Sequence, residues 1–149
     1  MKITSFDVID LRVPTSDQLL GSDPFHKEPD YSSAVLHLNT DTDLQGVSVV
    51  FTVGAGTDWI CYGIKDLCQL VVDTEFDEFT VAPFKLYQRL IDHHQLRWLH
   101  DGVFRMAAGA VLNAMWDLWA KEQRKPLWKL LVDLDPVFVA DCIDWRNIE

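Results

Sequence analysis

Polar side chains that could do chemistry are densest between residues 21 and 31, in the stretch GSDPFHKEPDY. The stretch combines carboxylate, imidazole, amine and phenol groups with glycine and proline, which are typical of loops. Carboxylate and hydroxyl groups can hydrogen-bond a hydroxyl-rich ligand, and glycine lets the backbone approach it closely. A plain hairpin needs only about two to five connecting residues. The extra length makes this loop the first candidate site.

Two other motifs offer metal ligands. DTDLQG at 41–46 has acids at positions one and three and glycine at position six of a calcium-type loop. Gln45 and Thr52 then occupy positions that should supply further ligands, so we predict a hairpin turn. A trio of histidines (His93, His94 and His100) includes an adjacent pair, and adjacent helical residues point about 100° apart, which suits a shared metal poorly. We predict no metal site in this chain.

The segment VGAGT at 53–57 is glycine-rich and lies between an expected strand and an expected helix. It lacks both the GxGxxG and the GK[ST] phosphate-binding patterns. Glycine freedom at a strand-to-helix turn explains it, although a helix N-terminus there could hold an anion weakly. No Ser-His-Asp or Cys-His pairing is evident, so we predict no catalytic residue from residue chemistry alone.

Composition and charge limit the possible partners. The chain has 149 residues, 48% of them hydrophobic, which suits one domain with a sizeable core. Its 13 basic and 23 acidic residues give a net charge of −10. Nucleic acids and anionic membranes bind basic faces, so we predict neither as a partner.

Three cysteines are too few and too widely spaced for a disulfide framework: Cys61, Cys68 and Cys142. Cys61 and Cys68 are seven residues apart, so we expect both on one helix face, packed as small apolar groups. The N-terminus has neither a signal peptide nor a membrane-spanning run. A reduced, cytoplasmic location is the expectation.

The elements that position the loop are strands on either side of it. Partial alternation predicts a strand from Lys2 to Val13, and SSAVLHLNT (32–40) and VSVVFTV (47–53) predict two more. Helical spacing then predicts a helix after Thr57 as N-cap, another from about Pro83, a long one in 102–123 and a short one in 127–133. The expected fold class is α+β, a three-stranded antiparallel β-meander followed by a helical bundle.

The last segment, VFVADCIDW (137–145), is rich in β-branched and aromatic residues and predicts one more strand. No neighbouring segment offers it a partner, and an unpaired strand leaves its backbone groups unsatisfied. We therefore expect it to belong to a sheet that this chain does not complete.

Three long phrases resemble a known family: VPTSDQLLGSDPFHKEPDYSSAVLHLNTD, QLRWLHDGVFRMAAGAVLNAMWDLWAKEQRKPLWKLL and CIDWR. They are similar to the N-terminal region of L-fuconate dehydratases, in the mandelate racemase branch of the enolase superfamily. The resemblance covers about residues 2–146 and implies a capping domain over 1–134. It implies that 135–149 form a linker and the first strand of an absent TIM barrel.

The resemblance also implies a division of chemistry. The acid/base groups and the Mg²⁺ ligands would lie on barrel strands, so no catalytic or metal-binding residue is expected here. The cap would close over an acid sugar such as L-fuconate while its carboxylate-adjacent proton is removed. By matching position, the substrate-binding residues would be Gly21, Ser22, Asp23 and Tyr31.

Three interpretations of the chain remain open. It is an inactive fragment or truncated product of a Mg²⁺-dependent dehydratase, or one half of a split enzyme, or a stand-alone binding domain that kept the cap fold. The last two require exposed apolar surface where a barrel would dock, expected at 137–145 and around Trp116, Trp119 and Trp128. An isolated cap should then self-associate.

Overall fold

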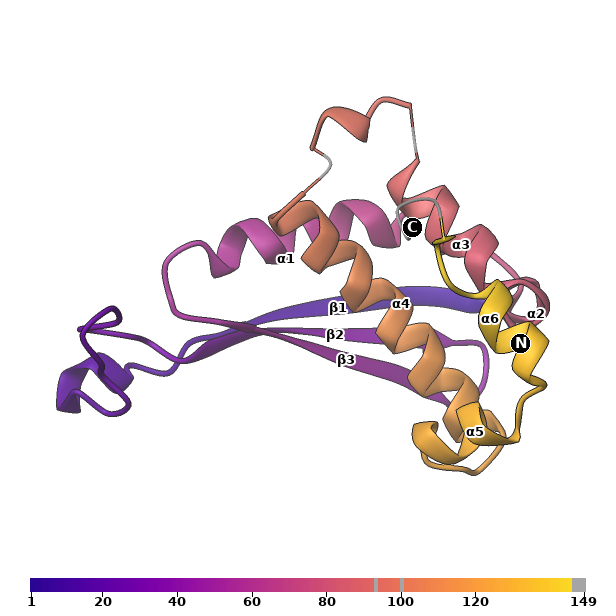
Figure 1. Cartoon of the computed structure of the whole chain (residues 1–149), viewed down its shortest axis with the longest axis horizontal. Coiled ribbons are helices and arrows are strands. Elements are labelled where there is room, and N and C mark those ends of the chain that lie inside the picture. The colour runs from indigo at the N-terminus through magenta and orange to yellow at the C-terminus, as the bar shows by residue number, and fades with distance from the viewer. Residues whose placement is uncertain (93, 100, 146–149) are drawn as a thin grey trace.

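A three-stranded antiparallel sheet carries the fold, in the order β1-β2-β3. In this computed structural model, which describes residues 1–92, 94–99 and 101–145, the strands are β1 (Ile3–Leu11), β2 (Ser32–Thr40) and β3 (Gln45–Thr52). Figure 1 shows the three strands running side by side and crossed by a long helix, with the β1–β2 connection projecting from one end. The predicted β-meander is confirmed.

Six α-helices follow the sheet within the described residues. They are α1 (Thr57–Cys68), α2 (Phe76–Val81), α3 (Pro83–Ile91), α4 (Val103–Glu122), α5 (Leu127–Asp133) and α6 (Pro136–Asp141). Short 3₁₀ turns occupy Thr15–Gln18 and Arg97–Leu99. The helices predicted at 83–91, 102–123 and 127–133 are confirmed, whereas α2 was not expected.

The core lies between the sheet and helices α1 and α4. Alternation along β2 buries Ala34, Leu36 and Leu38, while the residues between them stay partly exposed. The helices contribute fully or almost fully buried side chains at Ile64, Leu67, Cys68, Val111, Met115 and Leu118. The prediction that both helix α1 cysteines pack as apolar groups is confirmed.

Small residues bring α4 against the sheet. Gly46 of β3 lies so close to α4 that an added Cβ would stand 2.3 Å from the Ala114 carbonyl oxygen. The buried Ser48 hydroxyl donates to the Ala110 carbonyl at 2.7 Å, and the Val47 N–H donates to the Asp117 carboxylate at 2.7 Å. Helix α4 therefore both covers the sheet and satisfies backbone groups along the β3 edge.

Two predicted boundaries are wrong. Thr57 is the first residue of α1 and Gly56 is its N-cap, with φ of 88°. The Thr57 hydroxyl donates backward to the Gly54 carbonyl at 2.7 Å and caps no helical N–H. The helix also ends at Cys68, and turns carry the chain on to Thr74.

The strand predicted at 137–145 is also wrong, because this segment begins with helix α6. Asp135 is its N-cap, and its carboxylate accepts from the Val137 N–H at 2.8 Å and the Phe138 N–H at 3.3 Å. Pro136 occupies the first helical turn, which it favours. This Asp-Pro start signal outweighs the strand preference of the β-branched residues that follow. The boundary at 134/135 stays a prediction.

Candidate substrate loop

Hydrogen bonds close the base of the loop between β1 and β2. The Thr15 hydroxyl donates to the Pro29 carbonyl at 2.6 Å and accepts from the Tyr31 N–H at 3.0 Å. The Asp30 carboxylate accepts from both the N–H (3.1 Å) and the hydroxyl (2.6 Å) of Ser16. These Ser16 bonds hold the pKa of Asp30 below its usual value. Because its ends are joined, the loop is a compact projection (Figure 1).

Asp23 organises the outer part of the loop. Its carboxylate accepts from the Phe25 and His26 N–H groups at 2.7 Å each, and lies 3.0 Å from the His26 Nδ1. Three hydrogen bonds lower the pKa of Asp23. In order of decreasing effect, they involve the His26 N–H, the His26 side chain and the Phe25 N–H. The side chain is still 48% exposed, so free lone pairs of an ionised carboxylate face solvent.

Gly21 and Tyr31 meet across the loop. The Tyr31 hydroxyl donates to the Gly21 carbonyl at 2.5 Å, and an added Cβ on Gly21 would stand 2.4 Å from the Tyr31 ring. Gly21 also has φ of +72°, which favours glycine. Because the Tyr31 O–H already donates to the Gly21 carbonyl, the Tyr31 oxygen can only accept hydrogen bonds from a ligand.

The four predicted substrate residues thus share one ordered loop, in which Gly21 and Tyr31 touch each other. Ser22 and Asp23 lie exposed between them and the loop tip. Their contact with a ligand stays a prediction. Sequence reasoning missed the hydrogen bonds that close the loop, and it missed Arg12, which donates to the Gly54 carbonyl at 2.5 Å.

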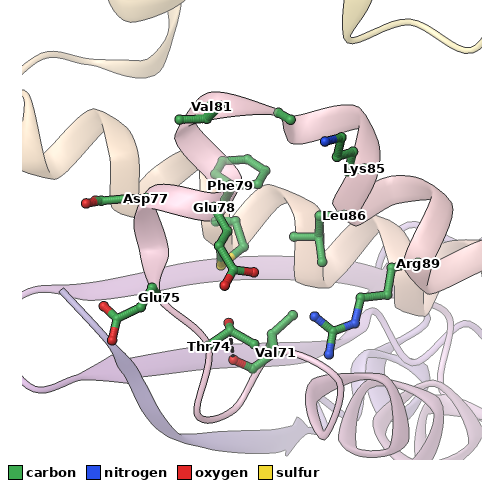
Figure 2. Close-up of a pocket in the computed structure, with 12 residues that line it drawn as sticks. Val71, Thr74, Glu75, Asp77, Glu78, Phe79, Val81, Lys85, Leu86 and Arg89 are labelled. Carbon is green, nitrogen blue, oxygen red and sulfur yellow. Dashed lines mark hydrogen bonds between the residues drawn. The ribbon is translucent and has the colours of Figure 1, made fainter.

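A separate hollow of about 490 Å³ lies between α2 and α3, far from the loop. Apolar side chains form part of its lining, including Phe79, Leu86 and Met115. Figure 2 shows Glu78 and Arg89 reaching toward it from different sides. Both charged residues are exposed, and none of the predicted site residues lines this hollow. It plays no part in the candidate site.

The two motifs that offered metal ligands differ in what the structure describes of them. Among residues 1–92, 94–99 and 101–145, no three His, Cys, Asp or Glu side chains gather as metal ligands. Asp41 of DTDLQG instead accepts from the Lys2 N–H at 2.9 Å. His93 and His100 lie outside the described residues.

The buried cysteines offer no nucleophile. Burial raises the pKa of the Cys68 thiol to about 12, and burial also raises the pKa of Cys61. A thiol with a raised pKa carries little of the reactive thiolate near neutral pH.

The family comparison decides where the chain belongs. Residues 18–132 match the model of the mandelate racemase / muconate lactonizing enzyme N-terminal domain. The chain belongs to this family. The predicted membership of the enolase superfamily is thereby confirmed for its N-terminal domain, whereas the likeness to L-fuconate dehydratases in particular stays a prediction.

Curated relatives match this chain along nearly the whole of its 149 residues. Mitochondrial enolase superfamily member 1 of Xenopus laevis is 42% identical over 151 residues, covering 99% of the chain and 34% of the relative. L-galactonate dehydratase of Hypocrea jecorina is 38% identical over 148 residues, covering 98% and 33%. The chain therefore spans about a third of the length of these relatives.

Solved structures agree with the fold. The crystal structure of human mitochondrial enolase superfamily member 1 aligns with a TM-score of 0.94 at 40% identity, covering 99% of this chain and 34% of that one. L-Talarate dehydratase from Polaromonas sp. JS666, solved with Mg and L-glucarate, aligns with a TM-score of 0.67 at 19% identity over 90% of this chain and 33% of that one. The second likeness shows the fold alone.

The enolase-superfamily capping fold is thus established for the described part of the chain. In that part, no helix has the length and apolar character needed to cross a bilayer.

Proposed function

We propose that this chain is the capping part of a Mg²⁺-dependent sugar-acid dehydratase, and that the loop at 21–31 covers the substrate. The observation that carries the proposal is the 38% identity to an L-galactonate dehydratase over 98% of the chain. The substrate class is an acid sugar such as L-galactonate or L-fuconate. The compartment stays a prediction: the sequence favours the cytoplasm, whereas the animal relatives are named mitochondrial.

The loop has suitable chemistry for this role. The Asp23 carboxylate and the Ser22 hydroxyl are exposed and can bond sugar hydroxyls. An aspartate is ionised at neutral pH, and the hydrogen bonds that lower the pKa of Asp23 favour that charged form further. The closed loop base fixes these groups before the ligand arrives, which reduces the entropy lost on binding.

Among the described residues, no three His, Cys, Asp or Glu side chains gather as metal ligands, so we assign no step of the reaction to Mg²⁺ on this chain. When bound by a TIM barrel, Mg²⁺ would stabilise the charge that develops beside the substrate carboxylate. The role of this chain is to orient the sugar acid and exclude water from it.

A chimera tests the proposal. The chain should replace the corresponding third of the Hypocrea enzyme, and the product should dehydrate a sugar acid in the presence of Mg²⁺. Ser22→Ala, Asp23→Ala and Tyr31→Phe should each lower kcat/KM by about tenfold or less, as expected for one hydrogen bond. If all three keep normal kinetics, the loop assignment is wrong. Dehydration by the 149-residue chain alone would contradict the assignment of catalysis to a barrel.

A second candidate function is a non-catalytic binding domain, alone or as one half of a split enzyme. It is favoured by the sheet face opposite α1 and α4, where Ile9, Leu11, Val49 and Phe51 are all about half exposed. The docking surface expected at the tryptophans is smaller, since Trp116 and Trp119 stack at 5.2 Å and only Trp128 is largely exposed. Self-association through the sheet face would support this candidate.

A further inference from the structure

Arg12 follows β1 and makes contacts to three separate segments. Its guanidinium forms a bidentate pair with Asp10, with Nε at 2.5 Å from Oδ1 and Nη2 at 2.8 Å from Oδ2. It also donates from Nη1 to the Gly54 carbonyl at 2.5 Å, and Nη2 lies 3.6 Å from the Asp58 carboxylate. The planar guanidinium is well suited to several simultaneous bonds of this kind.

The Gly54 carbonyl accepts several hydrogen bonds within the β3–α1 turn. Besides Arg12, it accepts from the Thr57 hydroxyl at 2.7 Å and the Thr57 N–H at 3.2 Å. Gly54 has φ of +107°, a conformation that disfavours other residues. The turn is therefore fixed in shape, and Arg12 is bound to a fixed point.

The same turn contacts the base of the candidate substrate loop. The Asp30 N–H donates to the Val53 carbonyl at 3.3 Å, and an added Cβ on Gly54 would stand 2.9 Å from the Asp30 Cβ. Asp30 in turn holds Ser16 on the opposite side of the loop base. Figure 1 shows the loop and the β3–α1 connection at the same end of the sheet.

From this geometry we infer that Arg12 is a positioning residue that joins the 53–56 turn to the loop at 15–31, so that the two segments hold one orientation together. The carboxylate of Asp10 orients the guanidinium, and the Gly54 carbonyl accepts a hydrogen bond from it. Asp30, which contacts both Val53 and Gly54, connects the turn to the loop. The role in substrate positioning rests on the proposed function, but the joining of the two segments does not.

Hydrogen exchange on the free chain tests the joining. Arg12→Gln should raise amide exchange in both 15–31 and 53–57 by about tenfold, because local opening no longer breaks the Arg12 bonds. Arg89→Gln removes the same charge from exposed α3 and should leave both segments unchanged. Amides of β2 serve as the internal reference for intact folding.

Arg12→Lys provides the graded variant, and it carries the test if Arg12→Gln does not fold. One ammonium cannot reproduce the bidentate pair and the carbonyl bond together, so exchange should rise in both segments by less. In the variant that folds, hydrogen exchange that rises in only one of the two segments, or in neither of them, would overturn the inference.

Kinetics in the chimera separate this inference from the proposed function. Arg12→Gln should raise KM by about tenfold with a smaller change in kcat, because the loop binds the sugar acid while the reacting groups lie elsewhere. Unchanged KM in an active chimera would overturn substrate positioning by Arg12. The chimera could be inactive while Arg12→Gln still raises hydrogen exchange in both segments of the free chain. That result would contradict the proposed function and leave intact the inference that Arg12 joins the two segments.

Discussion

Tyr31 has a structural role in the loop in addition to the binding role predicted for it. Its hydroxyl, expected to face substrate, donates to the Gly21 carbonyl, and its ring lies 5.7 Å from the ring of Phe51. A kinetic loss in Tyr31→Phe would therefore combine loop loosening with any lost substrate contact. Ser22→Ala is the cleaner probe, because the Ser22 side chain is exposed.

Removing the Tyr31 hydroxyl should loosen the loop even without a ligand. One hydrogen bond contributes about 1 kcal/mol, so Tyr31→Phe should open residues 19–26 about fivefold more often. Limited proteolysis of the free chain measures this opening. Tyr62→Phe, at a site 74% exposed on α1, is the matched control and should be cleaved like the parent. Equal cleavage of all three proteins would contradict the role assigned to Tyr31.

Asp30 gives the loop base a dependence on acid. Its pKa is lowered in the folded chain, so the ionised form stabilises the closed base. This stabilisation is present above the ordinary pKa of 3.8 and is lost as the pH falls through the lower folded value. The NMR shift of the Ser16 amide should titrate with a midpoint below 3.8, and Asp30→Asn should abolish that titration. A midpoint at or above 3.8 would contradict the assignment.

Among the elements, the contact between β3 and α4 depends most on small residues. Gly46→Ala places a methyl group against the Ala114 carbonyl and should lower the free energy of unfolding by roughly 1–3 kcal/mol. Gly109→Ala, within α4 and facing open space, should raise it by about 0.5–1 kcal/mol. Urea unfolding followed by circular dichroism measures both. Shifts of the same sign would show that the contact is looser than described.

The strands could be predicted because their alternation follows directly from burial on one side. Ala34, Leu36 and Leu38 alternate with half-exposed residues in β2, so the pattern and the structure agree. Helix α6 could not be predicted from composition, since Val137, Phe138 and Val139 favour a strand. The Asp135-Pro136 start signal is present in the sequence, but the β-branched and aromatic residues after it carry the stronger strand preference.

The internal geometry of the candidate site was beyond sequence reasoning. Tyr31 meets Gly21 only because Thr15, Ser16 and Asp30 close the loop base, and such side-chain bonds carry no periodic signal. Arg12 bonds Gly54 across 42 residues of sequence, a separation that local patterns cannot reveal. The residues of the loop were predictable, whereas their partners required coordinates.

At the scale of the whole molecule, the two-layer arrangement leaves one sheet face without a helical cover among the residues that the structure describes. Register places Ile9, Val35 and Val49 in one row and Leu11, Ser33 and Phe51 in the next, all facing away from α1 and α4. An apolar cluster of this kind on a protein surface is typical of an interaction site. The net charge of −10 opposes association between identical copies, so added salt should favour it.

Concentration-dependent self-association is therefore expected for the isolated chain. Val49→Lys should weaken it by placing a charge at the β3 end of one apolar row. Val132→Lys makes the same change on α5, at a side chain 74% exposed, and should leave association intact. Sedimentation equilibrium at low and high salt provides the measurement. A monomer at all concentrations, or equal effects of the two variants, would exclude the sheet face as the interface.

The order of the elements along the chain has a consequence for biosynthesis. The meander is complete at Thr52, but α4, which closes much of its inner face, ends only at Glu122. A nascent chain that emerges from the ribosome before α4 leaves part of the inner face of β2 and β3, including Leu38 and Ser48, open to water. Such intermediates aggregate readily. A chaperone would therefore act while the residues between Thr52 and Glu122 are being translated.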